Sequence, residues 1–465
     1  MITLFPDQTE MIAELRQAMR RSKNILLQSP TGSGKTAMAI WMINQAVKKG
    51  HKTMFTVPRR ELRKQTSLSF EEYGINHSYV AAGQSYNPFA KSYIGMVDTM
   101  ARRLDVLPDV DIVIIDETHF GMGSLNTVIN HYKKTGAWIV GLSATPWKSS
   151  GKGLGCWYDE MVMGKSIRWL IDNKRLSDYK FYGGETKPDL SGLKITGGNY
   201  AKGELATYME EKRVIIGDCV SDYRKRAMGR LHIVRCASIK HSEMTAQAFN
   251  DNGIPARHVD GTTSDDDMRK IIKAYARREI LVLTFCDLLN FGFDLSQASG
   301  MDVCIESGSD LKPTKSLAGQ MQYWGRILRY KEQPALIFDH VTNYDEHGFP
   351  CSERNWTLDD RKQNKRNTNE GEHIPTKQCT NCFFIHPPAP KCPECGFEYP
   401  IKSREIEQVD GELLEIDPKQ AIQERKKEQG RAQTLDDLIA IGKLRGMKHP
   451  TMWASKVIAA RMRKR

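Results

Sequence analysis

A glycine-rich segment, residues 29–36, constrains the fold of this chain more than any other feature of its sequence. The segment reads Ser-Pro-Thr-Gly-Ser-Gly-Lys-Thr. An apolar run at residues 24–27 precedes it and predicts a strand, and an amphipathic stretch at residues 37–47 follows it and predicts a helix. Strand, glycine loop and helix in this order form the context that a phosphate-binding loop requires. The order therefore predicts an α/β fold with a phosphate site at the end of a strand.

The last five residues of the loop have physical roles in such a site. Gly32, Ser33 and Gly34 let successive backbone N–H groups converge on phosphate oxygens. Lys35 places a point charge at the outer phosphates, and the Thr36 hydroxyl is a ligand for Mg²⁺.

Apolar runs alternate with helical patterns along most of the chain, which is typical of parallel sheets covered by helices. A first series of runs lies at residues 24–28, 53–57, 94–97, 112–115 and 138–142, and a second at 231–236, 256–259, 280–284, 301–305 and 335–338. We therefore expect two α/β domains in tandem. The expected limits are 1–150 and 226–350 for these domains, 151–225 for a connecting element, 351–378 for a polar linker, 379–400 for a cysteine-rich element and 401–465 for a basic helical region.

Composition narrows the class of protein. With 465 residues, 40% of them hydrophobic and 27% charged, the chain is typical of a globular protein. No run approaches the roughly 20 apolar residues of a membrane helix, and the N-terminus lacks a secretion signal, so we expect no membrane partner and a cytosolic location. The net charge of +12 favours a polyanionic partner such as nucleic acid. Residues 421–465 carry 12 Lys or Arg against 4 Asp or Glu, so the excess charge is concentrated there.

Four of the ten cysteines form a cluster with the spacing of a metal site. Cys379 and Cys382 make one Cys-x-x-Cys turn, and Cys392 and Cys395 make a second. Two such turns complete a tetrahedral Zn²⁺ site with no open position, which indicates structural rather than catalytic zinc.

The roles of the two C-terminal parts are open. In the cysteine-rich element, the rings of Phe383, Phe384, His386 and Phe397 either stack on bases or form the core of a small domain. In the basic region, Thr434 caps one predicted helix and Thr451 starts another. This pair of helices either grips a phosphate backbone, with Trp453 as a stacking residue, or presents a solvated basic face.

An acidic pair follows the apolar strand at residues 112–115. Asp116 lies where an open α/β sheet places a carboxylate that binds Mg²⁺. Glu117, one residue on, is placed to orient and deprotonate an attacking water.

These residues carry a family resemblance. Asp-Glu-Thr-His at residues 116–119, with Gly-Leu-Ser-Ala-Thr-Pro at residues 141–146, resembles motifs II and III of superfamily 2 helicases. Other segments match family motifs in chain order: residues 4–8 resemble the glutamine motif, 57–62 motif Ia, 97–100 motif Ib, 283–294 motif V and 322–329 the arginine-finger motif VI. The resemblance implies two RecA-like domains that bind ATP and Mg²⁺.

The resemblance also implies roles for single residues. Gln8 reads the adenine edge, and Phe5 stands where many relatives have Arg. Gly292 and Asp294 belong to the nucleotide site, with Asp294 binding the ribose or an arginine. Gln322, Arg326 and Arg329 complete the site from the second domain, where a guanidinium meets the γ-phosphate charge. Residues 57–62 and 97–100 contact the nucleic-acid backbone.

A helicase core followed by a four-cysteine element is similar to the RadD-type repair helicases of bacteria and their relatives encoded by phages. This resemblance implies an ATP-driven enzyme of a bacterial or phage-infected cytosol that acts on single-stranded or branched DNA in replication, recombination or repair, with single-strand-binding protein as a partner. An RNA helicase is an alternative, and so is a clamp or scaffold that uses ATP as a switch without unwinding. Lys35, Glu117 and Arg326 argue against a pure scaffold, because such a protein needs no hydrolytic residues.

Overall fold

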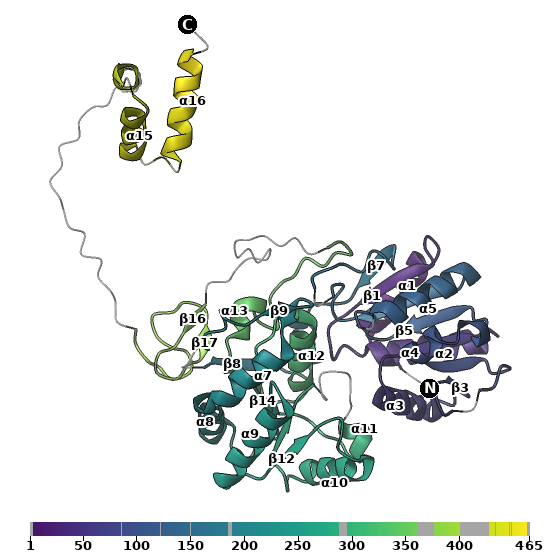
Figure 1. Cartoon of the computed structure of the whole chain (residues 1–465). Helices are drawn as coiled ribbons and strands as arrows, with labels where there is room; N and C mark the ends of the chain where they lie inside the picture. The colour runs from purple at the N-terminus through teal and green to yellow at the C-terminus, as the bar shows by residue number, and fades with distance from the viewer. Residues whose placement is uncertain are drawn as a thin grey trace. The chain divides into compact units, whose positions relative to one another are not determined.

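The computed structural model describes residues 3–84, 86–120, 122–148, 150–184, 188–287, 295–360, 376–399, 427–432, 434–445, 447 and 449–462 (Figure 1). The chain divides into two compact units, Met1–Tyr399 and Pro400–Arg465. No helix among the described residues is long and apolar enough to cross a membrane.

The first sheet of the larger unit has seven parallel strands in the order β3-β4-β2-β5-β6-β1-β7. Their bounds are β1 Asn24–Gln28, β2 Thr53–Val57, β3 Ser78–Val80, β4 Ser92–Met96, β5 Ile112–Ile115, β6 Trp138–Ser143 and β7 Glu160–Met163. The helices of this part are α1 Pro6–Ala18, α2 Lys35–Lys48, α3 Arg60–Glu72, α4 Val97–Ala101 and α5 Met122–Thr135. In β1, Ile25 and Leu27 belong to one hydrophobic cluster and Leu26 to another. The centre of the sheet is buried on both faces, which is why a central strand such as β5, Ile-Val-Ile-Ile, is a continuous apolar run.

The second sheet has six parallel strands in the order β12-β13-β11-β14-β15-β8. Its strands are β8 Tyr179–Gly183, β11 His232–Arg235, β12 Ala256–Val259, β13 Val282–Phe285, β14 Ser307–Asp310 and β15 Ala335–Asp339. The helices are α6 Ile167–Asp172, α7 Lys202–Glu211, α8 Arg213–Asp222, α9 Ile239–Asp251, α10 Asp265–Ala276, α11 Leu295–Ser299, α12 Leu317–Ile327 and α13 Asn343–His347. Ile233 and Val234 of β11 belong to different hydrophobic clusters, so this sheet is also covered on both faces. The predicted fold class of two tandem parallel α/β sheets is confirmed.

One predicted strand is wrong. The apolar run at residues 301–305 lies outside any strand, and β14 begins at Ser307. The strand Ser-Gly-Ser-Asp is fully buried although it has no apolar side chain. The hydroxyls of its two serines form hydrogen bonds with the His232 imidazole on β11. Ser307 Oγ lies 2.8 Å from Nδ1, and Ser309 Oγ lies 3.1 Å from Nε2. These hydrogen bonds satisfy the buried polar groups of β14. A search for apolar runs does not detect a strand of this kind.

The region expected to connect the two domains contributes to both sheets. β7 pairs with β1 at the edge of the first sheet. β8 pairs with β15 at the edge of the second sheet. Residues 164–178 therefore form the crossing from one sheet to the other, and α7 and α8 pack against the second sheet.

Part of the expected polar linker at 351–378 packs against the first sheet instead of running free in solvent. Residues 355–360 return to the first sheet, where Gly155 N donates to Leu358 O at 2.9 Å. The rings of Trp147 and Trp356 lie 4.9 Å apart. The segment that follows the second sheet thus packs against the first sheet, on the connection between β6 and β7.

The smaller unit contains α15 Leu435–Leu444 and α16 Pro450–Met462. Thr434 Oγ1 accepts from Asp437 N, and the Asp437 carboxylate accepts from Thr434 N, so the predicted cap of α15 is confirmed. Leu438 and Ala454 form a small core, and Trp453 packs against it. The indole of Trp453 therefore contributes to the core of the smaller unit.

Candidate nucleotide-hydrolysis site and zinc centre

The glycine loop connects the carboxyl end of β1 to the start of α2. Gly32 and Gly34 have φ of 88° and 86°, a left-handed backbone that disfavours side chains. Lys35 is the first residue of α2, and its ammonium donates to the carbonyls of Ser29 at 2.9 Å and Pro30 at 3.1 Å. Thr36 follows it and is exposed. The N-terminus of α2 and the ammonium of Lys35 thus lie together at the loop. This arrangement favours the binding of an anion.

The glutamine predicted to read adenine is tied to this loop. Gln8 Nε2 donates to Ser33 O at 2.9 Å, and Gln8 Oε1 accepts from Phe5 N at 3.0 Å. A Cβ atom added to Gly34 would lie 2.3 Å from Gln8 Nε2. Gln8 therefore packs directly on the loop, while the Phe5 ring is about half exposed.

The acidic pair lies at the same edge of the sheet, because β5 is parallel to β1 and Asp116 follows its last residue. Burial, together with the neighbouring Glu117, raises the pKa of the Asp116 carboxyl to about 7. Burial lowers the pKa of Lys35, and the nearby Glu117 and Asp116 oppose that shift. The loop lysine and the two carboxylates therefore share one buried electrostatic environment.

Glu117 is held in a sparsely populated backbone conformation with φ of 47°. Its Oε2 lies 3.5 Å from His119 Nδ1, and that nitrogen lies 2.8 Å from Ser143 Oγ at the end of β6. Burial lowers the pKa of His119, which favours a neutral ring. Glu117 Oε2 is buried without a hydrogen-bond partner among the described residues, so this oxygen is open to accept a proton, as a general base requires.

Helix α12 of the second sheet touches the phosphate loop. A Cβ atom added to Gly325 would lie 2.4 Å from the side chain of Thr31. Gln322 and Arg326 flank this contact on α12 and are buried, with 2% and 7% exposure, and Arg329 lies just beyond the end of the helix. The amide of Gln322 and the hydroxyl of Thr31 are buried without a hydrogen-bond partner among the described residues. Buried polar groups of this kind fit a bound polar molecule such as a nucleotide phosphate.

The residues predicted for the nucleotide site divide into three groups by their placement, and Phe5 joins the first group through its backbone bond to Gln8. Those at the carboxyl edge of the first sheet lie together: Gln8, Gly32, Ser33, Gly34, Lys35, Thr36, Asp116 and Glu117. The arginine-motif residues of α12 meet them through Gly325. Gly292 and Asp294 lie outside the described residues.

Sequence reasoning missed Arg175. Its guanidinium lies 3.4 Å from the centroid of the Phe5 ring and forms an ion pair with Asp7. No local motif marks this residue, because its partners are more than 160 positions away in the chain.

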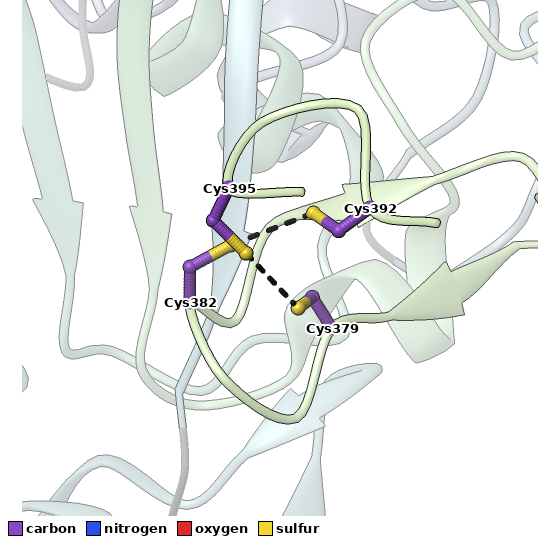
Figure 2. A group of neighbouring side chains, drawn as sticks. All are labelled: Cys379, Cys382, Cys392 and Cys395. Carbon is purple, nitrogen blue, oxygen red and sulfur yellow. Dashed lines mark hydrogen bonds between the residues drawn. The ribbon is translucent and has the colours of Figure 1, made fainter. Parts of the chain in front are cut away.

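The four thiols of the cysteine-rich element point toward one another (Figure 2). Cys379 Sγ lies 3.7 Å from Cys395 Sγ, and Cys382 Sγ lies 3.7 Å from Cys392 Sγ. A tetrahedral site with Zn–S bonds of about 2.3 Å places its sulfurs about 3.8 Å apart, so the donor set fits zinc.

The same element packs on the edge of the second sheet, where β8 lies beside its two short strands, β16 Lys377–Gln378 and β17 Ile385–His386 (Figure 1). Lys180 Nζ donates to the Glu394 carboxylate at 2.7 Å, and Arg226 Nη2 donates to Cys382 O at 3.0 Å. The Phe384 ring lies 5.5 Å from that of Tyr182. This aromatic side chain is thus part of a core contact.

Comparison with known proteins decides the family. The family model described as the res subunit of type III restriction enzymes matches residues 1–148. A 51.5 kDa protein of a Lactococcus phage is 31% identical over 381 residues, which span 82% of this chain and 79% of that protein. A candidate ATP-dependent helicase of Saccharomyces cerevisiae, Irc3, is 26% identical over 328 residues, or 66% of this chain and 46% of Irc3.

The chain belongs to the superfamily 2 helicases. Among solved structures, the type ISP restriction-modification enzyme LlaBIII has the same fold over 73% of this chain and 28% of that enzyme, with a TM-score of 0.52 and 14% identity. This superfamily 2 helicase is an ATP-hydrolysing enzyme that acts on nucleic acid, and the chain spans about half the length of Irc3.

Proposed function

We propose that this helicase hydrolyses ATP to move along or remodel DNA in replication, recombination or repair. The observation that carries the proposal is the contact of α12 with the phosphate loop, which joins residues of both sheets in one buried site. A DNA substrate is supported by the LlaBIII structure, which is bound to DNA.

In the proposed reaction, Lys35 neutralises the outer phosphates, and Thr36 and Asp116 would hold Mg²⁺, which would screen the phosphate charge. Glu117 accepts a proton from a water whose oxygen attacks the γ-phosphorus, and ADP leaves from the opposite side. Gln322, Arg326 and Arg329 meet the equatorial oxygens from the second sheet, so hydrolysis requires the two sheets to be in contact.

Nucleic acid binds, in this proposal, along the carboxyl edge of the first sheet. Motif Ia at 57–62 follows the end of β2, and motif Ib forms α4 directly after β4. Because the strands are parallel, both segments lie at the edge that also carries the nucleotide loop. Arg102 and Arg103 follow α4 and are exposed, which suits contacts with a phosphate backbone.

The remaining parts have supporting roles in the proposal. The four cysteines hold a structural Zn²⁺, and the basic C-terminal unit adds non-specific affinity for DNA. The family resemblance favours single-strand-binding protein as a partner and the cytosol of a bacterial or phage-infected cell as the location.

The proposal is tested by steady-state ATP hydrolysis with single-stranded DNA, forked DNA, duplex DNA or single-stranded RNA, and with no polymer, using Lys35→Ala as the blank. Stimulation by DNA and not by RNA, absent in the blank, is the expected result. Stimulation by RNA alone would overturn the substrate. Equal hydrolysis under all conditions would favour an ATP-driven switch.

A further inference from the structure

The crossing between the two sheets ends in three consecutive residues, Arg175, Leu176 and Ser177, that contact three different parts of the nucleotide site. Leu176 and Ser177 are each 2% exposed, and the Arg175 side chain is largely buried. None of the three belongs to a segment matched to a helicase motif.

Arg175 contacts the segment around Gln8 that is predicted to read adenine, which is called the adenine end below. Its guanidinium pairs with the Asp7 carboxylate and covers the Phe5 ring at 3.4 Å from the centroid. Both partners are neighbours of Gln8, which bonds to the loop residue Ser33. Arg175 thus fixes the start of α1, the helix from which Gln8 reaches the phosphate loop.

Leu176 contacts the phosphate loop itself. A Cβ atom added to Gly32 would lie 2.9 Å from Leu176 Cδ2, and the next nearest atom is Gly325 O at 3.8 Å. The Leu176 backbone also forms an antiparallel bridge with Arg329. This side chain therefore lies where the loop and α12 meet.

Ser177 holds the end of α12, whose last carbonyls lack partners within the helix. Ser177 N donates to Leu328 O at 2.9 Å. Its hydroxyl lies 3.0 Å from Arg329 O and 3.0 Å from Lys331 O, and it accepts from Lys331 N at 2.7 Å. Lys331 Nζ adds bonds to Ile327 O at 2.5 Å and Arg329 O at 3.0 Å.

We propose that Arg175, Leu176 and Ser177 form a positioning element that sets the arginine motif of α12 against the phosphate loop and links it to the adenine end of the site. The inference rests on the proposed roles of Arg326 and Arg329 in hydrolysis and on the predicted role of Gln8 in adenine binding. Ser177 acts on the step after binding, because it holds the backbone that carries these arginines. Arg175 acts on binding, because its partners lie at the adenine end.

The test separates kcat from KM for ATP in the full chain. Ser177→Ala lowers kcat about tenfold or more and leaves KM within about twofold, since a small misplacement of a catalytic group is costly. Ser177→Thr keeps the hydroxyl and restores most of kcat. Arg175→Gln raises KM about tenfold, and Arg175→Lys restores part of it.

Arg168→Gln is the matched control for Arg175→Gln, because Arg168 lies in the same segment but pairs with Asp172 and Asp178 at the surface. Thermal unfolding of each variant is recorded in parallel. A loss of kcat in Ser177→Ala without a change in the unfolding midpoint supports positioning. Equal kcat and KM in Ser177→Ala and wild type would overturn it.

Arg326→Ala serves as the reference that keeps the two proposals apart. If Arg326→Ala retains kcat, the proposed catalytic role of α12 is wrong, and the positioning element has nothing to position. If Arg326→Ala loses kcat while Ser177→Ala and Arg175→Gln behave as wild type, only the positioning inference is wrong.

Discussion

Gly34 and Gly50 allow the cost of a left-handed backbone to be separated from the cost of a steric clash. Their φ values are 86° and 90°, but an added Cβ at Gly34 meets Gln8, whereas at Gly50 it meets nothing within 4 Å. Both Gly→Ala changes lower the free energy of unfolding by about 1–2 kcal/mol through the backbone. Only Gly34→Ala also raises KM for ATP, because it displaces Gln8. Denaturant unfolding and ATPase titrations of the two variants measure this difference, and equal KM values would contradict it.

Glu117 is the residue whose role makes the sharpest chemical prediction. Glu117→Gln keeps the size of the side chain but removes the group that accepts the water proton, so kcat for ATP falls about 100-fold or more. Binding of a fluorescent ATP analogue stays close to wild type. A variant that retains more than about half of the wild-type kcat would exclude Glu117 as the base.

At the scale of elements, hydrophobic patterning predicted the strands where burial is apolar and missed one where it is polar. The bounds of β1, β2 and β5 match the predicted runs, since these strands are buried on both faces by aliphatic side chains. β14 was missed because its Ser-Gly-Ser-Asp sequence is satisfied by hydrogen bonds. Such pairing depends on a residue of another strand, His232, so no local pattern indicates it.

The buried imidazole of His232 makes the stability of the second domain dependent on pH. Burial, and secondarily the charge of His340, lowers the pKa of His232 from 6.5 to about 3. The unfolded chain therefore binds a proton that the folded chain excludes, so stability is full above about pH 6.5 and is lost as the pH falls from there toward 3. The contribution is up to about 1.4 kcal/mol per pH unit. Unfolding free energies measured between pH 7.5 and 5.5 decline less steeply in His232→Gln, and identical slopes would contradict this.

The cysteine-rich element is expected to support the sheet on which it packs. Removal of the proposed zinc by a chelator, or Cys392→Ser, lowers the midpoint of thermal unfolding by at least about 3 °C, because the contacts of Glu394 and Phe384 with β8 depend on the folded turns. Cys156→Ser is the control, since Cys156 is an exposed cysteine outside the cluster. An unchanged midpoint after complete metal removal would show that the element does not brace the sheet.

At the scale of the whole molecule, the two sheets are joined by more than the single connection that the sequence suggested. The crossing at Arg175–Ser177 bonds to α12, and residues 355–360 return to the first sheet beside Trp147. The phosphate loop and the acidic pair were predictable, because each is a local sequence next to a strand. The contacts between the sheets were not, because residues such as Arg175 and Asp7 are distant in sequence and carry no motif.

The central claim is that ATP hydrolysis at the junction of the two sheets drives movement on DNA. The most direct measurement is ATP-dependent strand release from forked DNA, with an RNA duplex of the same sequence in parallel and Lys35→Ala as the blank. The account predicts release from forked DNA that requires hydrolysable ATP and is absent in the blank. Release from the RNA duplex alone, or release by Lys35→Ala at the wild-type rate, would contradict it.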